Sequence, residues 1–310
     1  MKTISILIPC YNEQESLPAL YKRLKFLTES IKNYKFEILF VNDGSRDNTL
    51  KIIKELRQQD DSINYVDLSR NFGKEIAMIA GIDHIDSDAM IVMDADLQDP
   101  PELIKEMLYW WEQGYKDVCA KRKSRAGETW FKKWSSHTYY KVLQKVTRIQ
   151  VQPDVGDFRL LDRQCIDALK QMRESQRYTK GLFSWIGFDK KEILFDRDAR
   201  VAGKTKWNYF SLFNLAVEGI TSFTIFPLML ASIIGMLIAA LAIIYMLFII
   251  IKTLIYGGDV AGYPSLISVI LFIGGVQLVF LGIMGEYLGR IFNETKGRPL
   301  YFVKEYSKED

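Results

Sequence analysis

Short apolar runs alternate with amphipathic stretches over the first 113 residues. Four apolar runs are typical of strands buried on both faces of a sheet: residues 4–8, 36–41, 64–68 and 89–93. Four stretches place apolar residues at helical spacing: residues 15–31, 47–59, 74–85 and 100–113. This alternation predicts a doubly wound α/β domain, Rossmann-like, with a mostly parallel sheet.

Two much longer apolar runs occupy the C-terminal third of the chain. Residues 227–251 contain no charged side chain in 25 positions, and residues 265–285 contain none in 21. A helix of about 20 residues spans the hydrocarbon core of a bilayer, which is roughly 30 Å thick. Each run therefore predicts a transmembrane helix, in preference to a helix buried in a soluble core. Lysines and arginines flank the pair on its outer sides, which predicts that both chain ends are cytoplasmic.

The average composition conceals these two unlike parts. The chain of 310 residues has a mean hydropathy of −0.03 and a net charge of +3, values that are ordinary for a soluble protein. The excess positive charge belongs to residues 1–226, because residues 227–310 hold six basic and six acidic side chains. Such a small excess excludes a nucleic-acid-binding protein. Three scattered cysteines and two histidines exclude a Cys/His zinc site.

Aromatic and basic residues are interleaved in two further stretches, residues 130–146 and 207–226. This mixture is typical of helices that lie in the membrane interface. Ordinary packing against the sheet is the alternative for each stretch.

Polar clusters follow three of the predicted strands at their carboxyl ends. They are residues 11–13, residues 42–45 and residues 94–96. In open α/β sheets, ligands bind at this edge, so the convergence of the clusters predicts a binding site.

The third cluster indicates a metal. Asp94 and Asp96 alternate on an extended segment, so their carboxylates point the same way, and Gln98 could add a carbonyl oxygen. These hard ligands suit Mg²⁺ or Mn²⁺ that also binds a diphosphate, although such a pair also occurs by chance on solvated loops. The chain contains no P-loop and no glycine fingerprint after its first strand, which argues against an NTPase or a dinucleotide dehydrogenase.

Five segments together resemble a known family: PCYNE (9–13), VNDGS (41–45), SRNFGKE (69–75), DADLQDPPE (94–102) and GDFRLLDR (156–163). The chain resembles glycosyltransferase family 2, and more narrowly the polyprenyl-phosphate glycosyltransferases. This group includes dolichol-phosphate mannose synthases and bacterial bactoprenol glucosyltransferases. The two C-terminal spans fit the bactoprenol subgroup.

The resemblance implies a GT-A fold and assigns roles to residues. The donor nucleotide would be held by Pro9, Tyr11, Glu13, Asp43, Asn71, Gly73, Lys74 and Asp94. The metal would be held against the donor diphosphate by Asp94, Asp96 and Gln98, with Asp96 also counted as catalytic. Asp157 falls where the family places a catalytic carboxylate near the acceptor, and its alternative is a carboxylate that caps a backbone group at a strand end.

Basic residues are expected to bind the acceptor phosphate. Arg122 and Arg125 follow the apolar run 118–120, and guanidinium groups suit phosphate oxygens. Three more cations, Arg200, Lys204 and Lys206, lie in a segment that resembles the family loop R-x-x-G-x-S-K-Y. This chain has Thr205 and Trp207 in place of the serine and tyrosine. Solvated or headgroup-facing charges are the alternative for each cation.

The expected activity is inverting transfer of one sugar, with UDP-glucose as donor, to undecaprenyl phosphate at the cytoplasmic face of the inner membrane. UDP-N-acetylglucosamine and GDP-mannose are alternative donors. A processive polysaccharide synthase is disfavoured because the Q-x-x-R-W motif is missing, and a non-catalytic membrane scaffold is disfavoured by the converging carboxylates. We expect a catalytic domain (1–206), a juxtamembrane helix (207–226), a two-helix anchor (227–285) and a cytoplasmic tail (286–310). A homo-oligomer, expected to be a tetramer, completes the prediction.

Overall fold

The computed structural model describes residues 1–123, 155–175, 177, 179–195, 224–256 and 262–308. The chain divides into two compact units, which are considered separately below. The first contains Met1–Gly219 and Arg298–Asp310, and the second contains Ile220–Gly297.

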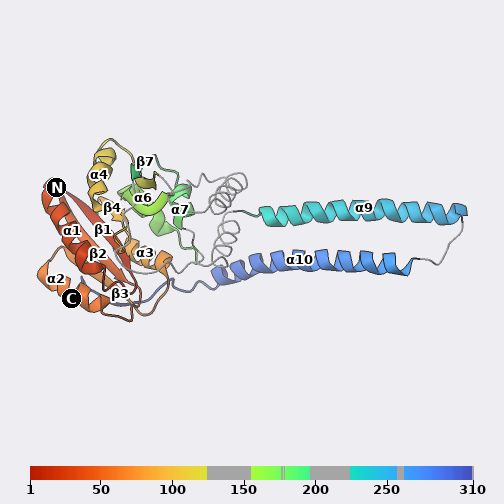
Figure 1. The fold of residues 1–310 in the computed structure, drawn as a ribbon, viewed down its shortest axis with the longest axis horizontal. Helices are drawn as coiled ribbons and strands as arrows, with labels where there is room; N and C mark the ends of the chain where they lie inside the picture. Colours follow the sequence, from red (N-terminus) through yellow and green to blue (C-terminus); the bar gives the residue numbers. More distant parts are fainter. Residues whose placement is uncertain (124–154, 176, 178, 196–223, 257–261, 309–310) are drawn as a thin grey trace. The chain divides into compact units, whose positions relative to one another are not determined.

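The first unit is an α/β domain (Figure 1). Its strands are β1 (Lys2–Cys10), β2 (Tyr34–Asn42), β3 (Ile63–Leu68), β4 (Ala89–Val92), β5 (Asp117–Arg122), β6 (Val155–Asp162), β7 (Lys190–Phe195) and β8 (Val303–Tyr306). Its helical segments are α1 (Leu17–Ser30), α2 (Thr49–Gln59), α3 (Lys74–Asp83), the 3-10 turn η1 (Pro101–Leu103), α4 (Ile104–Glu112), α6 (Arg163–Gln171) and α7 (Thr179–Trp185). The four strands and four helices predicted for residues 1–113 are all present, with boundaries shifted by a few residues.

The eight strands form one sheet in the order β7-β5-β6-β4-β1-β2-β3-β8. The central strands β4, β1, β2 and β3 run parallel, and so do β5 and β7. Strands β6 and β8 run antiparallel to their neighbours. Because β1 to β4 are parallel, their carboxyl ends lie at the same edge of the sheet. The predicted fold class is therefore confirmed.

Alternate residues of β1 pack on opposite faces of the sheet. Ile4, Ile6 and Ile8 are fully buried in a core cluster that also contains residues of α1, α2 and α4. Leu7 packs on the other face against α3, where a Cβ on Gly81 would lie 2.1 Å from its Cδ1 atom. Only glycine lets α3 approach the sheet this closely, so α3 and the loop before it are held firmly against β1.

A buried ion pair joins the strands on the far side of β4. The Arg159 guanidinium lies 3.0 Å from an Asp117 carboxylate oxygen, and it also donates to the Gly156 carbonyl oxygen at 3.1 Å. The guanidinium stacks over the Phe183 ring at 4.0 Å. Because Arg159 and Gly156 flank Asp157 in β6, these contacts position the Asp157 backbone.

The C-terminal residues differ from the simple tail that the hydropathy pattern suggests. Residues 286–295 continue α10 of the second unit, and residues 303–306 form β8, which pairs antiparallel with β3. Glu305 of β8 accepts hydrogen bonds from the Lys54 ammonium (2.6 Å) and the Tyr65 hydroxyl (2.5 Å). Just before the strand, the Tyr301 hydroxyl donates to Asp83 at 2.7 Å. Four residues are too few to show an alternating pattern in the sequence. The strand forms because β3 provides its hydrogen-bond partners.

The second unit contains two long helices, α9 (Phe226–Tyr256) and α10 (Tyr263–Thr295), which lie side by side (Figure 1). Two segments, Phe226–Tyr256 and Phe272–Thr295, are long and apolar enough to cross a membrane, and the most apolar part of each is exposed. Contiguous apolar surface of this extent is unfavourable in water, which agrees with a membrane environment. The aromatic and basic stretch at 130–146 and most of 207–226 lie outside the described residues.

Deleting residues 301–310 should destabilise the α/β domain, because it removes the β8 pairing, the Tyr301–Asp83 bond and the Glu305 contacts. At about 1 kcal/mol for each hydrogen bond lost, we expect the melting temperature of the detergent-solubilised protein to fall by about 5–10 °C. Deleting only residues 309–310 is the control and should leave the melting temperature unchanged. Equal melting temperatures for the long deletion and the wild type would show that β8 adds no stability.

Candidate active site

The loop after β1 is joined to the loop after β2 by side chain to backbone hydrogen bonds. The Asn12 amide N–H donates to Ser45 Oγ at 3.0 Å, and Asn12 Oδ1 accepts from the Arg46 N–H at 2.8 Å. The Glu13 N–H donates to Thr49 Oγ1 at 2.8 Å. Asn12 has a φ of 57°, a left-handed conformation that asparagine tolerates better than most residues. These bonds present Tyr11 and Glu13 at the carboxyl edge of the sheet.

Asp43 joins the loop after β2 to the loop after β3. Its Oδ1 accepts from the Phe72 N–H at 2.7 Å, and its Oδ2 accepts from the Gly73 N–H at 2.9 Å. Asn71 adds a bond from its side-chain amide to the Asp43 carbonyl oxygen at 3.2 Å. Burial raises the pKa of Asp43, and the two N–H donors oppose that rise. The carboxylate therefore holds the 71–73 loop in place immediately before α3.

Gly44 allows these two loops to approach closely. Its φ is +61°, and a Cβ at this position would lie 2.4 Å from the Arg70 carbonyl carbon and 2.5 Å from the Asn71 nitrogen. Both the backbone conformation and the close approach require glycine. This explains the glycine of the VNDGS segment in physical terms.

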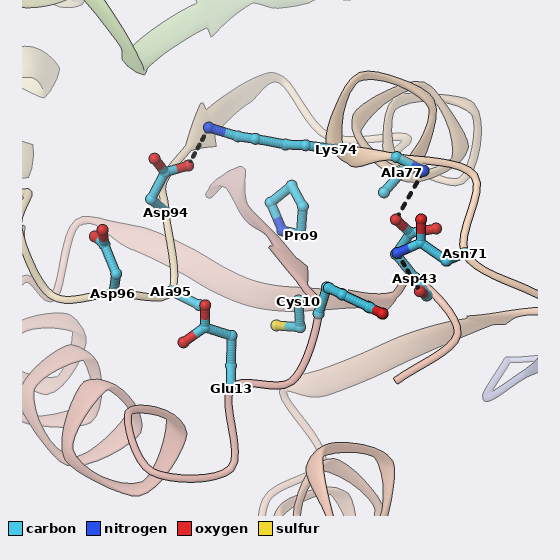
Figure 2. Close-up of a pocket in the computed structure, with 12 residues that line it drawn as sticks. Pro9, Cys10, Glu13, Asp43, Asn71, Lys74, Ala77, Asp94, Ala95 and Asp96 are labelled. Carbon is cyan, nitrogen blue, oxygen red and sulfur yellow. Dashed lines mark hydrogen bonds and ion pairs between the residues drawn. The ribbon is translucent and has the colours of Figure 1, made fainter. Parts of the chain in front are cut away.

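A cavity of about 390 Å³ opens at this edge of the sheet. It is lined by Pro9, Cys10, Tyr11, Glu13, Asp43, Asn71, Gly73, Lys74, Ala77, Asp94, Ala95 and Asp96. All eight residues that the family resemblance assigns to the donor nucleotide are among them, together with Asp96. Figure 2 shows Glu13, Asp94 and Asp96 on one side of the cavity and Asp43 with Asn71 on the other.

Lys74 links the cavity to β6. Its Nζ atom lies 2.6 Å from Asp94 Oδ1 and 2.5 Å from Asp157 Oδ2. Figure 2 shows the side chain extending past Pro9 to reach Asp94. Burial favours the neutral form of each group, but the attraction between ammonium and carboxylates outweighs it. As a result the pKa of Lys74 is raised, and that of Asp157 is lowered to about 2.

Asp157 lies beside the cavity lining rather than in it. Its side chain is 12% exposed, and its second carboxylate oxygen, Oδ1, has no hydrogen-bond partner among the described residues. A buried carboxylate oxygen without a donor can still accept a hydrogen bond from a bound molecule.

Glu75 follows Lys74 in α3 and lies outside the cavity lining, and no sequence pattern distinguishes it. It is half-buried, and its Oε2 accepts from the Thr179 N–H at 3.2 Å. Burial and the nearby Asp157 charge raise the pKa of Glu75 to about 7. Helical spacing alone could not reveal it, because α7 and β6, which create its environment, lie far away in the sequence.

Two of the carboxylates that line the cavity, those of Asp94 and Asp96, are hard oxygen ligands of the kind that Mg²⁺ and Mn²⁺ take. Burial raises the pKa of Glu13, and repulsion from Asp96 and Asp94 raises it further, so the cavity carries excess negative charge. Within the described part of the chain, no three His, Cys, Asp or Glu side chains are grouped so as to hold a metal alone. A pair of carboxylates that leaves the remaining positions to water and phosphate oxygens is the usual arrangement for Mg²⁺.

Two predicted site residues, Gln98 and Arg122, lie outside the cavity lining. Gln98 is 8% exposed, outside the cavity lining, and its Oε1 has no hydrogen-bond partner among the described residues. Its backbone N–H donates to Asp96 Oδ1 at 3.2 Å, so it contacts the site through the backbone. Arg122 ends β5 and also lies outside the lining. Arg125, Arg200, Lys204 and Lys206 lie outside the described residues.

Comparison with known proteins gives concordant matches. Residues 5–169 match the family described as glycosyl transferase family 2. An uncharacterized glycosyltransferase of Synechocystis sp. is 49% identical over 302 residues, which cover 97% of this chain and 95% of that protein. The bactoprenol glucosyl transferase of Shigella phage SfX is 42% identical, covering 97% of this chain and 98% of its own. Among solved structures, mannosyl-3-phosphoglycerate synthase from Rubrobacter xylanophilus matches with a TM-score of 0.49 and 16% identity, over 70% of this chain and 71% of that one.

Replacing Gly44 by alanine should separate the two loops that form one wall of the cavity. The new Cβ cannot fit 2.4 Å from the Arg70 backbone, so the Asp43 bonds to Phe72 and Gly73 should weaken. We expect the melting temperature to fall by about 3–8 °C and the affinity for a nucleoside diphosphate to fall at least about tenfold. Gly114→Ala is the matched control, because Gly114 also has a positive φ (101°), but no atom of the described residues lies within 4 Å of the place its Cβ would take. Similar losses in both variants would assign the effect to backbone conformation alone.

Replacing Glu75 by glutamine should change how stability depends on pH. The folded pKa of about 7 exceeds the ordinary value of 4.5, so the folded state binds more protons and wild-type stability falls as pH rises from about 4.5 to 7. Glutamine keeps an acceptor for the Thr179 N–H and carries no charge. We expect Glu75→Gln to raise the melting temperature by about 3–8 °C at pH 8 and to change it little at pH 4.5. A shift of the same size at both pH values would contradict the assignment.

Proposed function

Because this chain belongs to glycosyl transferase family 2, we propose that it transfers one glucose residue from UDP-glucose to a polyprenyl phosphate held in a membrane. The observation that carries the proposal is the cavity at the carboxyl edge of the sheet, where Asp94 and Asp96 lie opposite Asp43 and Asn71. This arrangement leads us to place a nucleotide diphosphate with its base and ribose toward Asp43 and its phosphates toward the two aspartates.

Two further observations support the acceptor. The Shigella phage SfX relative, which matches this chain over nearly its full length, is named a bactoprenol glucosyl transferase. Helices α9 and α10 include segments long and apolar enough to cross a bilayer. A lipid acceptor requires a catalytic domain anchored at the membrane, and these helices fit that requirement.

We propose that Asp94 and Asp96 hold Mg²⁺ or Mn²⁺ together with the donor diphosphate, with Gln98 supporting Asp96 from behind through its backbone N–H. When bound, the cation supplies charge neutralisation for the diphosphate that leaves. Lys74 adds a second positive charge on the same side of the cavity. Asp43 keeps the 71–73 loop in position for the nucleotide.

The acceptor chemistry assigns a role to Asp157. A phosphate monoester is largely a dianion near neutral pH, because its second pKa is about 6, so the nucleophile needs no general base. A carboxylate with a pKa of about 2 is also too weak a base to serve as one. Asp157 therefore orients a hydroxyl group of the sugar through its Oδ1 atom, which has no hydrogen-bond partner among the described residues. Direct displacement at the anomeric carbon inverts its configuration.

The cationic residues predicted for the acceptor phosphate complete the proposal: Arg122, Arg125, Arg200, Lys204 and Lys206. We also propose that residues 130–146 and 207–226 lie at the membrane interface, that both termini face the cytoplasm, and that the protein forms a homo-oligomer.

A panel of labelled nucleotide sugars tests the proposed activity. Full-length protein in membranes containing undecaprenyl phosphate should transfer label from UDP-glucose into the lipid extract. Asp96→Asn should lower this activity by about 10²-fold or more, since it removes a charge that positions the cation. Asp61→Asn is the matched control, because the Asp61 carboxylate is fully exposed and pairs only with Arg57 on α2 among described residues.

The outcomes separate the alternatives. Label transferred to the lipid from UDP-N-acetylglucosamine or GDP-mannose, and not from UDP-glucose, would identify that nucleotide sugar as the donor. Label in a long polymer would indicate a processive synthase. No labelled lipid with any donor would favour a non-catalytic scaffold. Wild-type activity of Asp96→Asn without added Mg²⁺ or Mn²⁺ would refute the metal assignment.

A further inference from the structure

The side chains that line the cavity carry more negative than positive charge. Four of the described residues that line it carry carboxyl groups (Glu13, Asp43, Asp94 and Asp96), whereas Lys74 is the one lining residue with a positive charge. Asp43 binds two backbone N–H groups, and Glu13 accepts a hydrogen bond from Ser16 Oγ at 2.6 Å. Lys74 therefore neutralises the part of the cavity where Asp94 lies.

The Lys74 ammonium takes the position that a cation bound to Asp94 would need. Its Nζ atom is 2.6 Å from Asp94 Oδ1, a direct charge-assisted contact. A metal coordinated by the same carboxylate would lie about 2.1 Å from its oxygen and so within a few ångströms of the ammonium. Two cations this close repel each other strongly in a partly buried site. Asp94 therefore cannot hold both cations equally well.

Lys74 has a second partner that lies outside the cavity lining. Asp157 Oδ2 is 2.5 Å from its Nζ atom, and the Lys74 side chain is still 41% exposed. A lysine side chain has a flexible stem of four carbons and three N–H donors, so the ammonium can leave Asp94 for a phosphate oxygen while it keeps its contact with Asp157. The protein thus holds a mobile charge next to the metal-binding carboxylates.

We propose that Lys74 is a built-in counter-ion that occupies the cation position at Asp94 until the donor arrives, so that metal and nucleotide diphosphate bind together. The inference rests on the proposed function, because it concerns the same donor site. Without the diphosphate, the metal must displace Lys74 and finds only two carboxylates. With the diphosphate, Lys74 gains a new anionic partner and releases Asp94 to the metal.

Calorimetric titration of MnCl₂ into the full-length protein in detergent tests this role. Wild-type protein should bind Mn²⁺ alone weakly and bind it at least about tenfold more tightly with saturating UDP. Lys74→Gln removes the charge and keeps a donor for Asp157. This variant should bind Mn²⁺ alone about tenfold more tightly than wild type, with a smaller gain from UDP. Lys74→Arg keeps the charge and should restore weak binding of Mn²⁺ alone.

Lys180→Gln is the matched control. Lys180 lies in α7, its charge acts on Asp157, and it does not line the cavity. Its removal should leave the affinity for Mn²⁺ alone unchanged, and the melting temperature of each variant verifies folding. Unchanged Mn²⁺ affinity in Lys74→Gln, or an equal gain in Lys180→Gln, would overturn the counter-ion role while leaving the proposed function intact. Failure of the wild type to bind Mn²⁺ with UDP would overturn the donor assignment and the counter-ion role together.

Discussion

Negative charge crowded at one edge of a parallel sheet is the constraint on which this structure depends. Parallel strands β1, β2 and β4 end at the same edge, and each is followed by an acidic side chain that lines one cavity. Such an arrangement is unfavourable unless each carboxylate has a partner. The repulsion between these carboxylates is relieved by a different partner at each position, and each carboxylate has a different role as a result.

Asp43 and one carboxylate oxygen of Asp157 have partners within the protein itself. Asp43 binds two backbone N–H groups and thereby becomes a structural clamp between loops. The Asp157 carboxylate forms an ion pair with the Lys74 ammonium, which lowers its pKa and keeps it ionised. Asp94 shares that lysine. Burial raises the pKa of Glu13, and the nearby Asp96 and Asp94 carboxylates raise it further. The unfavourable charge is therefore concentrated at Asp94, Asp96 and Glu13, where a cation with a diphosphate would relieve it.

The same constraint explains why the loops are braced against one another. A cavity built from four loops could collapse or open, but three of these loops are joined, because Asn12, Asp43 and Asn71 each bind the backbone of a neighbouring loop. Gly44 removes the side chain that would keep two of these loops apart. Preorganised loops hold charges in place before the ligand binds, which lowers the reorganisation required during transfer.

Sequence patterns predict the parts of this architecture that depend on local periodicity. The runs that became β1 to β4 are apolar because both faces of the central sheet are covered, and their polar ends therefore identify the cavity. Strand β8 could not be predicted from local periodicity, because it has only four residues and forms through pairing with β3, which is distant in the sequence. The Lys74 contact with Asp157 spans 83 positions and depends on the approach of β6 to α3. The family segments therefore assign each residue to the site, but they do not predict that the two residues form an ion pair. Glu75 gains its raised pKa from the same approach.

The chemistry of the proposed acceptor makes this distribution of charge coherent. A glycosyltransferase that acts on a sugar hydroxyl requires a carboxylate free to take a proton, whereas a phosphate acceptor arrives already ionised. In this family member the carboxylate nearest to that role, Asp157, is paired with Lys74, and its pKa is too low for proton abstraction at neutral pH. What a phosphate acceptor does require is positive charge, because two anionic phosphates must approach one anomeric carbon. An ammonium that keeps its contact with Asp157 while it leaves Asp94 for the donor supplies such charge within the protein. The same pairing therefore keeps Asp157 a poor base and serves a phosphate nucleophile.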